Sequence, residues 1–345
     1  MTRYILGRLA QAVLVLWAAY TVAFLLLFAL PSDPVKILAG ADATDVTEAQ
    51  LDQLRHQFGL DKPLWQQYLD KLGALLHGDL GTSITSGRPV AQVVGEAIPP
   101  TLQIAALALV IAVIVGTAVA VGATWFRIAW LRSLLLAMPP LGVAVPSFWL
   151  GLLLIQWFSF QIPIFPAVGD RTLAAAALPA IVLAVPAGAN ISQLLAKSLS
   201  ATLGEPFIGT ARAKGASRSR VHLRHALRNA SLPAFTITGL IVGQLLAGTV
   251  VTETVFGRPG IGRVTAAAVE QQDLPVVLGV VLFAAAAFVI ANLFVDLLYP
   301  VLDPRISVVV RRAAARARAS SEPPAPSSGA SAPVDAPPVL AGGAR

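Results

Sequence analysis

Six long apolar runs constrain this sequence more than any other feature. A helix needs about 20 mostly apolar residues to cross the roughly 30 Å hydrocarbon core of a bilayer. The 345-residue chain is 56% hydrophobic and only 12% charged, about half of the charged fraction usual in soluble domains. Runs of the required length occur at residues 9–30, 102–123, 134–158, 173–195, 234–252 and 276–298. The sequence therefore predicts an all-α membrane protein with six transmembrane helices.

Two of the six runs have unusual features. Pro139, Pro140 and Pro146 interrupt the third run, and prolines of this kind kink or shorten a helix. The first run is too long for the apolar region of a signal peptide and is followed by no small-residue cleavage site. We therefore expect a bent third span and a first span that is retained.

The positions of the basic residues predict the orientation of the chain. Lys and Arg accumulate in the cytoplasmic loops of membrane proteins. When the six runs alternate across the bilayer, 17 of the 25 basic residues fall on the side of the N-terminus. We therefore expect a multi-pass protein of the inner or plasma membrane with both termini in the cytoplasm. The net charge of +7 could suggest binding to nucleic acid, but the positions of the basic residues are explained by membrane orientation. Nucleic acid is therefore not an expected partner.

The connections divide the chain into four parts. Residues 1–30 hold the cytoplasmic N-terminus and first span, and residues 101–305 hold the remaining spans. Residues 31–100 form an extracytoplasmic segment in which Thr47 and Gln50 predict a helix start, as does Pro63. A segment this short rarely builds its own core, so we expect it to pack on the outer ends of the spans. Residues 306–345 are rich in Arg, Ala, Pro and Ser, a composition that predicts a disordered cytoplasmic tail.

The cytoplasmic loop at residues 197–233 has a pattern of its own. A short helix is expected to end at Gly215, and Ser217 is suited to cap a second helix. On that second helix a basic row and an apolar row would lie side by side, and Leu232-Pro233 would turn the chain into the fifth span. The basic row contains Arg220, Arg224 and Arg228, and the apolar row contains Leu223 and Leu227. Two short helices at an angle would form a protruding knob, although the charges alone also fit contact with anionic membrane lipid.

An ordered series of motifs runs through the chain. Residues 78–83 read Gly-Asp-Leu-Gly-Thr-Ser, residues 146–151 read Pro-Ser-Phe-Trp-Leu-Gly, and residues 302–305 read Leu-Asp-Pro-Arg. The loop carries Thr-Ala-Arg-Ala-Lys-Gly-Ala-Ser at residues 210–217, and Pro-Gly-Ile-Gly follows the fifth span at residues 259–262. With these motifs the chain resembles the dipeptide/oligopeptide permease family of binding-protein-dependent ABC importers, over nearly all of residues 1–306.

The resemblance implies a type I ABC importer permease fold and a set of partners. It implies a homologous second permease subunit, two cytoplasmic ABC ATPase subunits and an extracytoplasmic substrate-binding protein. ATP and magnesium would bind to the ATPase subunits, and this chain would hold no cofactor or metal. The ATPase-coupling segment would consist of Thr210, Ala211, Arg212, Ala213, Lys214, Gly215 and Ala216. Peptides are the expected cargo, with nickel chelates, opines and glycosides as alternatives.

The chain departs from the family pattern at three positions. Members commonly carry basic residues near the end of the fourth span and an arginine before the coupling threonine. Gln193, Ala196 and Gly209 occupy these positions here. The departures bear on the substrate and on the detailed geometry of coupling.

Four polar residues in or beside the spans are candidate pathway residues. Polar side chains in hydrocarbon are costly and usually face the interior of a helix bundle. Asn190, Gln193 and Gln244 therefore either line the translocation pathway or form hydrogen bonds between helices. Glu253 lies at the outer end of the fifth span, where it would be an exposed carboxylate at the interface, or else a gate or an ammonium-sensing acid on the entry route.

Other classes of function have little support in the sequence. The chain has no cysteine and no Gly-Lys-Ser/Thr phosphate-binding motif, and no Asp, Glu, Lys or Arg occurs in the middle of a span. His222 and His225 have no third ligand nearby in the sequence, so we expect a solvated or interface pair. The chain is thus predicted to be a non-catalytic subunit. An ion-coupled secondary transporter is the less favoured alternative, because we find no internal repeat.

Overall fold

The computed structural model describes residues 2–28, 48–57, 61–167 and 172–302. Most of these residues form helices, and the β pairing among them is an isolated bridge between Thr82 and Pro89. The contacts discussed below lie within Met1–Tyr299, which form one compact unit. The predicted tail at residues 306–345 and the predicted cap residue Thr47 lie outside the described residues. The prediction of an all-α chain is confirmed.

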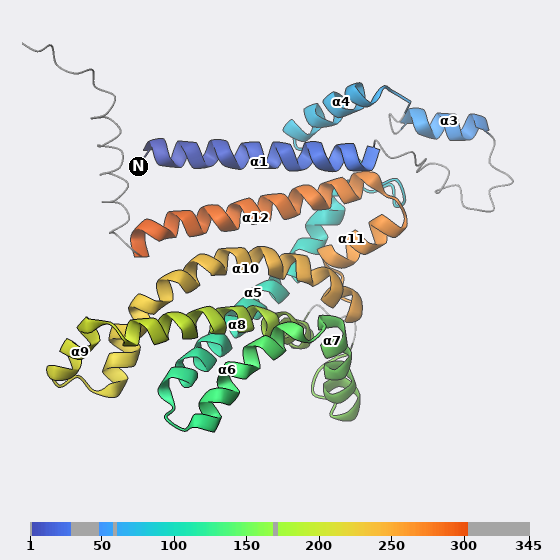
Figure 1. Cartoon of the computed structure of the whole chain (residues 1–345). Helices are drawn as coiled ribbons and strands as arrows, with labels where there is room; N and C mark the ends of the chain where they lie inside the picture. Colours follow the sequence, from blue (N-terminus) through green and yellow to red (C-terminus); the bar gives the residue numbers. More distant parts are fainter. Residues whose placement is uncertain (1, 29–47, 58–60, 168–171, 303–345) are drawn as a thin grey trace, which may run out of the picture. The chain divides into compact units, whose positions relative to one another are not determined.

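The helices follow the order of the predicted elements (Figure 1). Two short helices lie between the first and second long helices, as predicted for residues 31–100. The bounds are α1 (Thr2–Phe28), α3 (Glu48–Gln57), α4 (Leu64–Leu76), α5 (Val90–Trp125), α6 (Ala129–Ala144), α7 (Ser147–Ile155), the π-helix η1 (Gln156–Gln161), α8 (Leu173–Leu203), α9 (Pro206–Ala213), the π-helix η2 (Arg220–Ala226), α10 (Leu227–Val255), α11 (Ile261–Glu270) and α12 (Leu274–Leu302).

The predicted count of six spans is not confirmed. Among the described residues, four helical stretches are long and apolar enough to cross a membrane: residues 6–28, 90–125, 173–203 and 274–293. The third predicted span becomes the pair α6 and α7–η1, bent by 99°, which makes five if the pair crosses as one broken span. In α10 the described apolar stretch is shorter and covers Leu240–Val255.

The bend in the third predicted span occurs at one of its three prolines. Pro139 and Pro140 lie inside α6, and the chain breaks at Val145 and Pro146. Val145 adopts an extended conformation because the ring of a following proline disfavours the helical one. The predicted kink therefore becomes a sharp corner between two helices.

The centre of the structure is the contact between α5 and α8 (Figure 1), which α10 joins through Ile241 and Leu245. Small residues allow the two backbones to approach closely. A Cβ atom built on Gly116 of α5 would lie 2.7 Å from the carbonyl oxygen of Gly188, and one built on Gly188 would lie 3.2 Å from that of Ala112. Close packing of small residues is the usual means by which helices associate in lipid.

Helix α4 packs on α1, as predicted for the segment after the first span. The Tyr68 ring lies 5.6 Å from Tyr20 and 5.3 Å from Phe24, and its hydroxyl is 2.8 Å from Oγ1 of Thr21. Lys71 of the same helix lies over the ring of Phe28. Burial lowers the pKa of the Lys71 ammonium, because a charged amine loses solvation there. The segment is thus anchored to one end of α1.

Candidate coupling surface and pathway residues

Helix α9 carries the predicted coupling segment. Pro206 occupies its first turn, where a missing N–H group costs nothing. Gly215 ends it with a φ of +80°, a left-handed conformation that favours glycine. The amide of Gly215 donates to the Arg212 carbonyl at 2.9 Å, and that of Ala216 donates to the Ala211 carbonyl at 3.1 Å. The predicted helix end at Gly215 is confirmed.

Most of the predicted coupling segment is exposed. One side chain of α9, Ile208, is buried against α8, η2 and the end of α5, and Ala216 packs on the same cluster. The exposed members of the predicted segment are Thr210, Arg212, Ala213, Lys214 and Gly215, and the half-buried ones are Ala211 and Ala216. This segment therefore forms an exposed knob on an apolar base, although its role in coupling stays a prediction.

The end of α5 holds the knob through a tryptophan. Arg218 donates a hydrogen bond to the carbonyl oxygen of Trp125, and its guanidinium lies 4.8 Å from the centre of the Trp125 ring. His222 packs edge-on against the same ring at 5.0 Å, and its Nε2 lies 3.4 Å from the Thr124 carbonyl oxygen. His222 is 6% exposed, so of the two predicted surroundings, solvent or an interface, solvent is wrong at this position.

The second helix of the loop differs from its prediction in two ways. Residues 220–226 form a π-helix, which has more residues per turn than an α-helix, so the predicted apolar row is wrong. Leu223 is 54% exposed, whereas Val221 and Ala226 are buried. The predicted turn at Pro233 is also wrong, because the chain is helical without a break from Arg218 to Val255. The second helix of the loop is therefore continuous with α10.

The predicted pathway residues on α8 lie in different surroundings. Gln193 is exposed and lines a cavity of about 210 Å³ between α5, α6 and α8, together with Ser192 and Lys197. Asn190, one turn earlier, is half-buried and is not among the residues that line this cavity. Gln244 is exposed on α10. A pathway role for the three amides stays a prediction.

Replacing Asn190 and Gln193 together with leucine is expected to lower substrate uptake several-fold. Leucine removes the polar groups that the pathway would offer to a polar substrate. Uptake by proteoliposomes of the assembled transporter measures the effect. Asn292→Leu is a matched control, since its amide donates to the Phe288 carbonyl of its own helix. Unchanged uptake in the double variant would exclude the pathway role.

Glu253 is fully buried, so the prediction of an exposed carboxylate is wrong. Its Oε1 accepts a hydrogen bond from Thr101 Oγ1 at 2.6 Å. Its Oε2 accepts from the backbone amides of Gly262 at 2.7 Å and Arg263 at 3.3 Å. Arg258, also buried, donates to Gln103 Oε1 at 3.0 Å. The carboxylate thus joins α5, α10 and the start of α11.

A second buried carboxylate, Asp273, was missed by the sequence analysis. It accepts hydrogen bonds from Ser83 Oγ at 2.5 Å, Thr85 Oγ1 at 2.7 Å and the Ile84 amide at 3.2 Å. It also accepts from the Val276 amide at 3.4 Å, in the first turn of α12. An aspartate just before an apolar run is a helix-capping signal, and it was available in the sequence.

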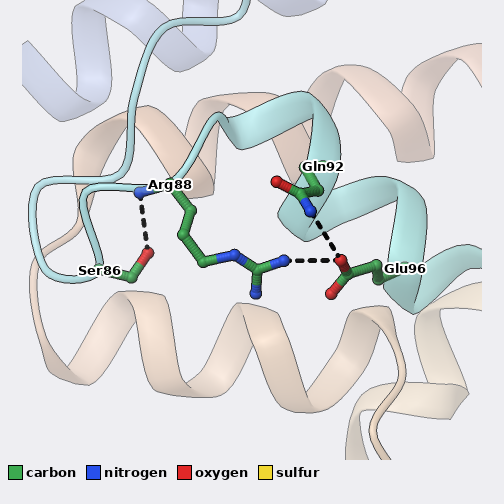
Figure 2. Close-up of polar contacts among 4 residues, drawn as sticks. All are labelled: Ser86, Arg88, Gln92 and Glu96. Carbon is green, nitrogen blue, oxygen red and sulfur yellow. Dashed lines mark hydrogen bonds and ion pairs between the residues drawn. The ribbon is translucent and has the colours of Figure 1, made fainter.

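The loop before α5 presents Ser83 to Asp273. Its turns use positive φ angles at Gly78, Gly81 and Gly87. Figure 2 shows Arg88 of this loop, which forms an exposed ion pair of 2.6 Å with Glu96. Gln92 donates to the same carboxylate at 3.2 Å. The loop is thus tied to α5 on one side and to Asp273 on the other.

The chain matches two families along its length. Residues 108–308 match the family described as binding-protein-dependent transport system inner membrane component. Residues 1–105 match the N-terminal region described for the membrane components of the same systems. The chain belongs to the family of inner membrane components of binding-protein-dependent transport systems. The resemblance in the sequence motifs is therefore confirmed, and with it the type I ABC importer permease fold.

Two relatives align over nearly their whole length. The glutathione transport system permease protein GsiC of Escherichia coli (strain K12) is 37% identical over 307 residues, which cover 89% of this chain and 99% of the relative. A putative peptide transport system permease protein of Brucella abortus (strain 2308) is 37% identical over 314 residues, with the same coverage. A solved amino acid ABC transporter with histidines aligns with a TM-score of 0.47 at 15% identity, over 61% of this chain and 94% of that chain. The chain is a permease subunit of an ABC importer, a system that includes a substrate-binding protein and ATPase subunits.

Proposed function

We propose that this chain forms half of the translocation pathway of an ATP-driven importer for di- and oligopeptides. It would pair with a homologous permease, and an extracytoplasmic binding protein would deliver the peptide. Two cytoplasmic ATPase subunits would hydrolyse ATP, so this chain itself would be non-catalytic. The observation that carries the proposal is the alignment over 99% of two relatives named as glutathione and peptide permeases.

The exposed segment on α9 supports the mechanical part of the proposal. It stands on a buried apolar base, in which Ile208 packs with residues of α8, and Arg218, just after the segment, is bound to Trp125 of α5. A push on this segment by an ATPase would therefore reach two membrane helices at once. The excess of basic residues on the N-terminal side supports a cytoplasmic position for α9.

Reconstitution of the complete importer tests the proposal. The chain is co-expressed with its second permease, its ATPases and its binding protein, and the membrane complex is purified and placed in liposomes. We expect the ATPases to co-purify with the chain, and labelled di- and tripeptides to accumulate only with ATP and the binding protein. The proposal would be contradicted if no ATPase co-purified with the chain, or if an ion gradient drove uptake without ATP. A binding protein that retains nickel chelates, opines or glycosides but no peptide would contradict the peptide assignment.

A further inference from the structure

The carboxylate of Glu253 satisfies the first turn of α11. The first amides of a helix have no acceptor within that helix and carry a partial positive charge. Here Gly262 and Arg263 donate to Glu253, while the Ile261 amide donates to Thr101 Oγ1 at 2.8 Å. Because Thr101 also binds Glu253, these residues form one buried group that joins α11 to α5 and α10.

Two glycines bring α11 into direct contact with α10. A Cβ atom built on Gly260 would lie 2.2 Å from the carboxyl group of Glu253. One built on Gly262 would lie 2.3 Å from the Cα atom of Val250. Side chains cannot fit at either position without a shift of the backbone or of the buried carboxylate. The start of α11 is therefore seated on α10 without a gap.

Asp273, shortly after the other end of α11, links that end to the loop before α5. The amide of Asp273 donates to the Ala268 carbonyl of α11 at 2.8 Å, while its side chain binds the loop at residues 83–85. Between the two anchored ends α11 keeps an exposed face with Arg263, Ala267, Val269 and Glu270. The helix is thus fixed at both ends and free on one side in the described structure.

Helix α10 connects this arrangement to the predicted coupling segment. Figure 1 shows α9 and α11 near opposite ends of α10. The 29 residues of α10 correspond to about 43 Å along the helix axis at 1.5 Å per residue. Binding protein and ATPases act on opposite faces of the membrane in the proposed function. If an ATPase binds at α9, then α11 lies toward the opposite face of the membrane, where the binding protein docks.

We propose that Glu253 is a positioning residue that fixes α11, so that docking of the loaded binding protein on α11 is transmitted through α10 to α9. The proposal rests on the proposed function. It assigns the exposed face of α11 as part of the surface that meets the binding protein. Glu253 itself touches no substrate in this arrangement.

The test replaces Glu253 with glutamine, which keeps the size of the side chain but replaces one carboxylate acceptor with an NH₂ group. We expect the stimulation of ATPase turnover by loaded binding protein to fall at least about fivefold, the lower range of coupling between sites. Glu253→Asp restores part of the stimulation. Asp70→Asn is the matched control, because its ion pair with Lys62 is exposed, contributes little and lies outside the groups that hold α11.

A distance measurement separates positioning from a general loss of structure. The chain has no cysteine, so Thr254→Cys on α10 and Ala267→Cys on α11 can carry two spin labels without background. Both positions are exposed. We expect a narrow distance distribution in the otherwise unchanged complex and a broad one after Glu253→Gln.

Three outcomes decide the proposal. Full stimulation together with a narrow distribution in Glu253→Gln overturns it, while the proposed function stands. If Glu253→Gln fails to assemble, Thr101→Ala replaces it, because this variant removes one hydrogen-bond donor and leaves the carboxylate. We then expect the stimulation by loaded binding protein to be lost in Thr101→Ala. Full stimulation in that variant overturns the proposal. If the unchanged complex shows no stimulation by any peptide-loaded binding protein, the proposed function fails and this inference fails with it.

Discussion

Deletion of residues 210–216, or replacement of Gly215 with proline, is expected to abolish uptake while the membrane helices remain inserted. Proline fixes φ near −65°, whereas Gly215 requires +80°, and proline also removes the amide that donates to Arg212. The segment would lose its shape at the point where the proposed function places the ATPase. ATP turnover in the reconstituted importer, measured with and without loaded binding protein, reports the uncoupling.

Gly209→Ala provides the matched control for this experiment. Gly209 lies in α9, one residue before the predicted segment, and a Cβ atom built there meets nothing within 4 Å. Alanine also favours the helix by about 1 kcal/mol over glycine. This variant should keep its uptake. Stimulation by substrate that survives in Gly215→Pro would show that the ATPase is coupled through another surface.

The predictions from sequence succeeded where local signals decide the structure. A glycine after a short helical pattern predicts a left-handed helix end, and Gly215 has that conformation. Long apolar runs predict membrane helices, and the ordered motifs were enough to identify the family. These signals involve residues close together in the chain, so no knowledge of the tertiary contacts was needed.

The predictions failed where distant contacts decide the structure. Glu253 resembles a surface residue in the sequence, since it lies at the end of an apolar run. Its burial depends on Thr101, which is 152 residues away, and on the start of α11. The π-helix at Arg220–Ala226 has no sequence signal that we recognised, and it places His222 against Trp125 of another helix. The residue type of Pro233 could not show whether the chain turns there or continues as a helix, because membrane helices tolerate proline.

Close approach between helices was likewise hidden in the sequence, although the glycines that permit it were visible. The chain has 27 glycines, and their spacing does not say which of them face another backbone. Gly116 and Gly95 lie on the same helix, α5, yet a Cβ atom on Gly116 would be 2.7 Å from the Gly188 carbonyl oxygen, and one on Gly95 meets nothing within 4 Å. The two positions therefore allow the effect of backbone approach to be separated from the effect of helix propensity.

Replacing Gly116 with alanine is expected to destabilise the subunit, whereas the same change at Gly95 is expected to be neutral or stabilising. Both variants gain about 1 kcal/mol of helix propensity. At Gly116 the added methyl group pushes α5 away from α8, and overpacking of this kind costs about 1–3 kcal/mol or more when the obstacle is backbone. Thermal unfolding of the purified subunit in detergent measures the difference, with a fall of several degrees expected for Gly116→Ala. A melting temperature for Gly116→Ala at or above that of Gly95→Ala would mean that the contact between α5 and α8 yields without cost. The close packing of small residues would then not be what holds the centre of this fold together.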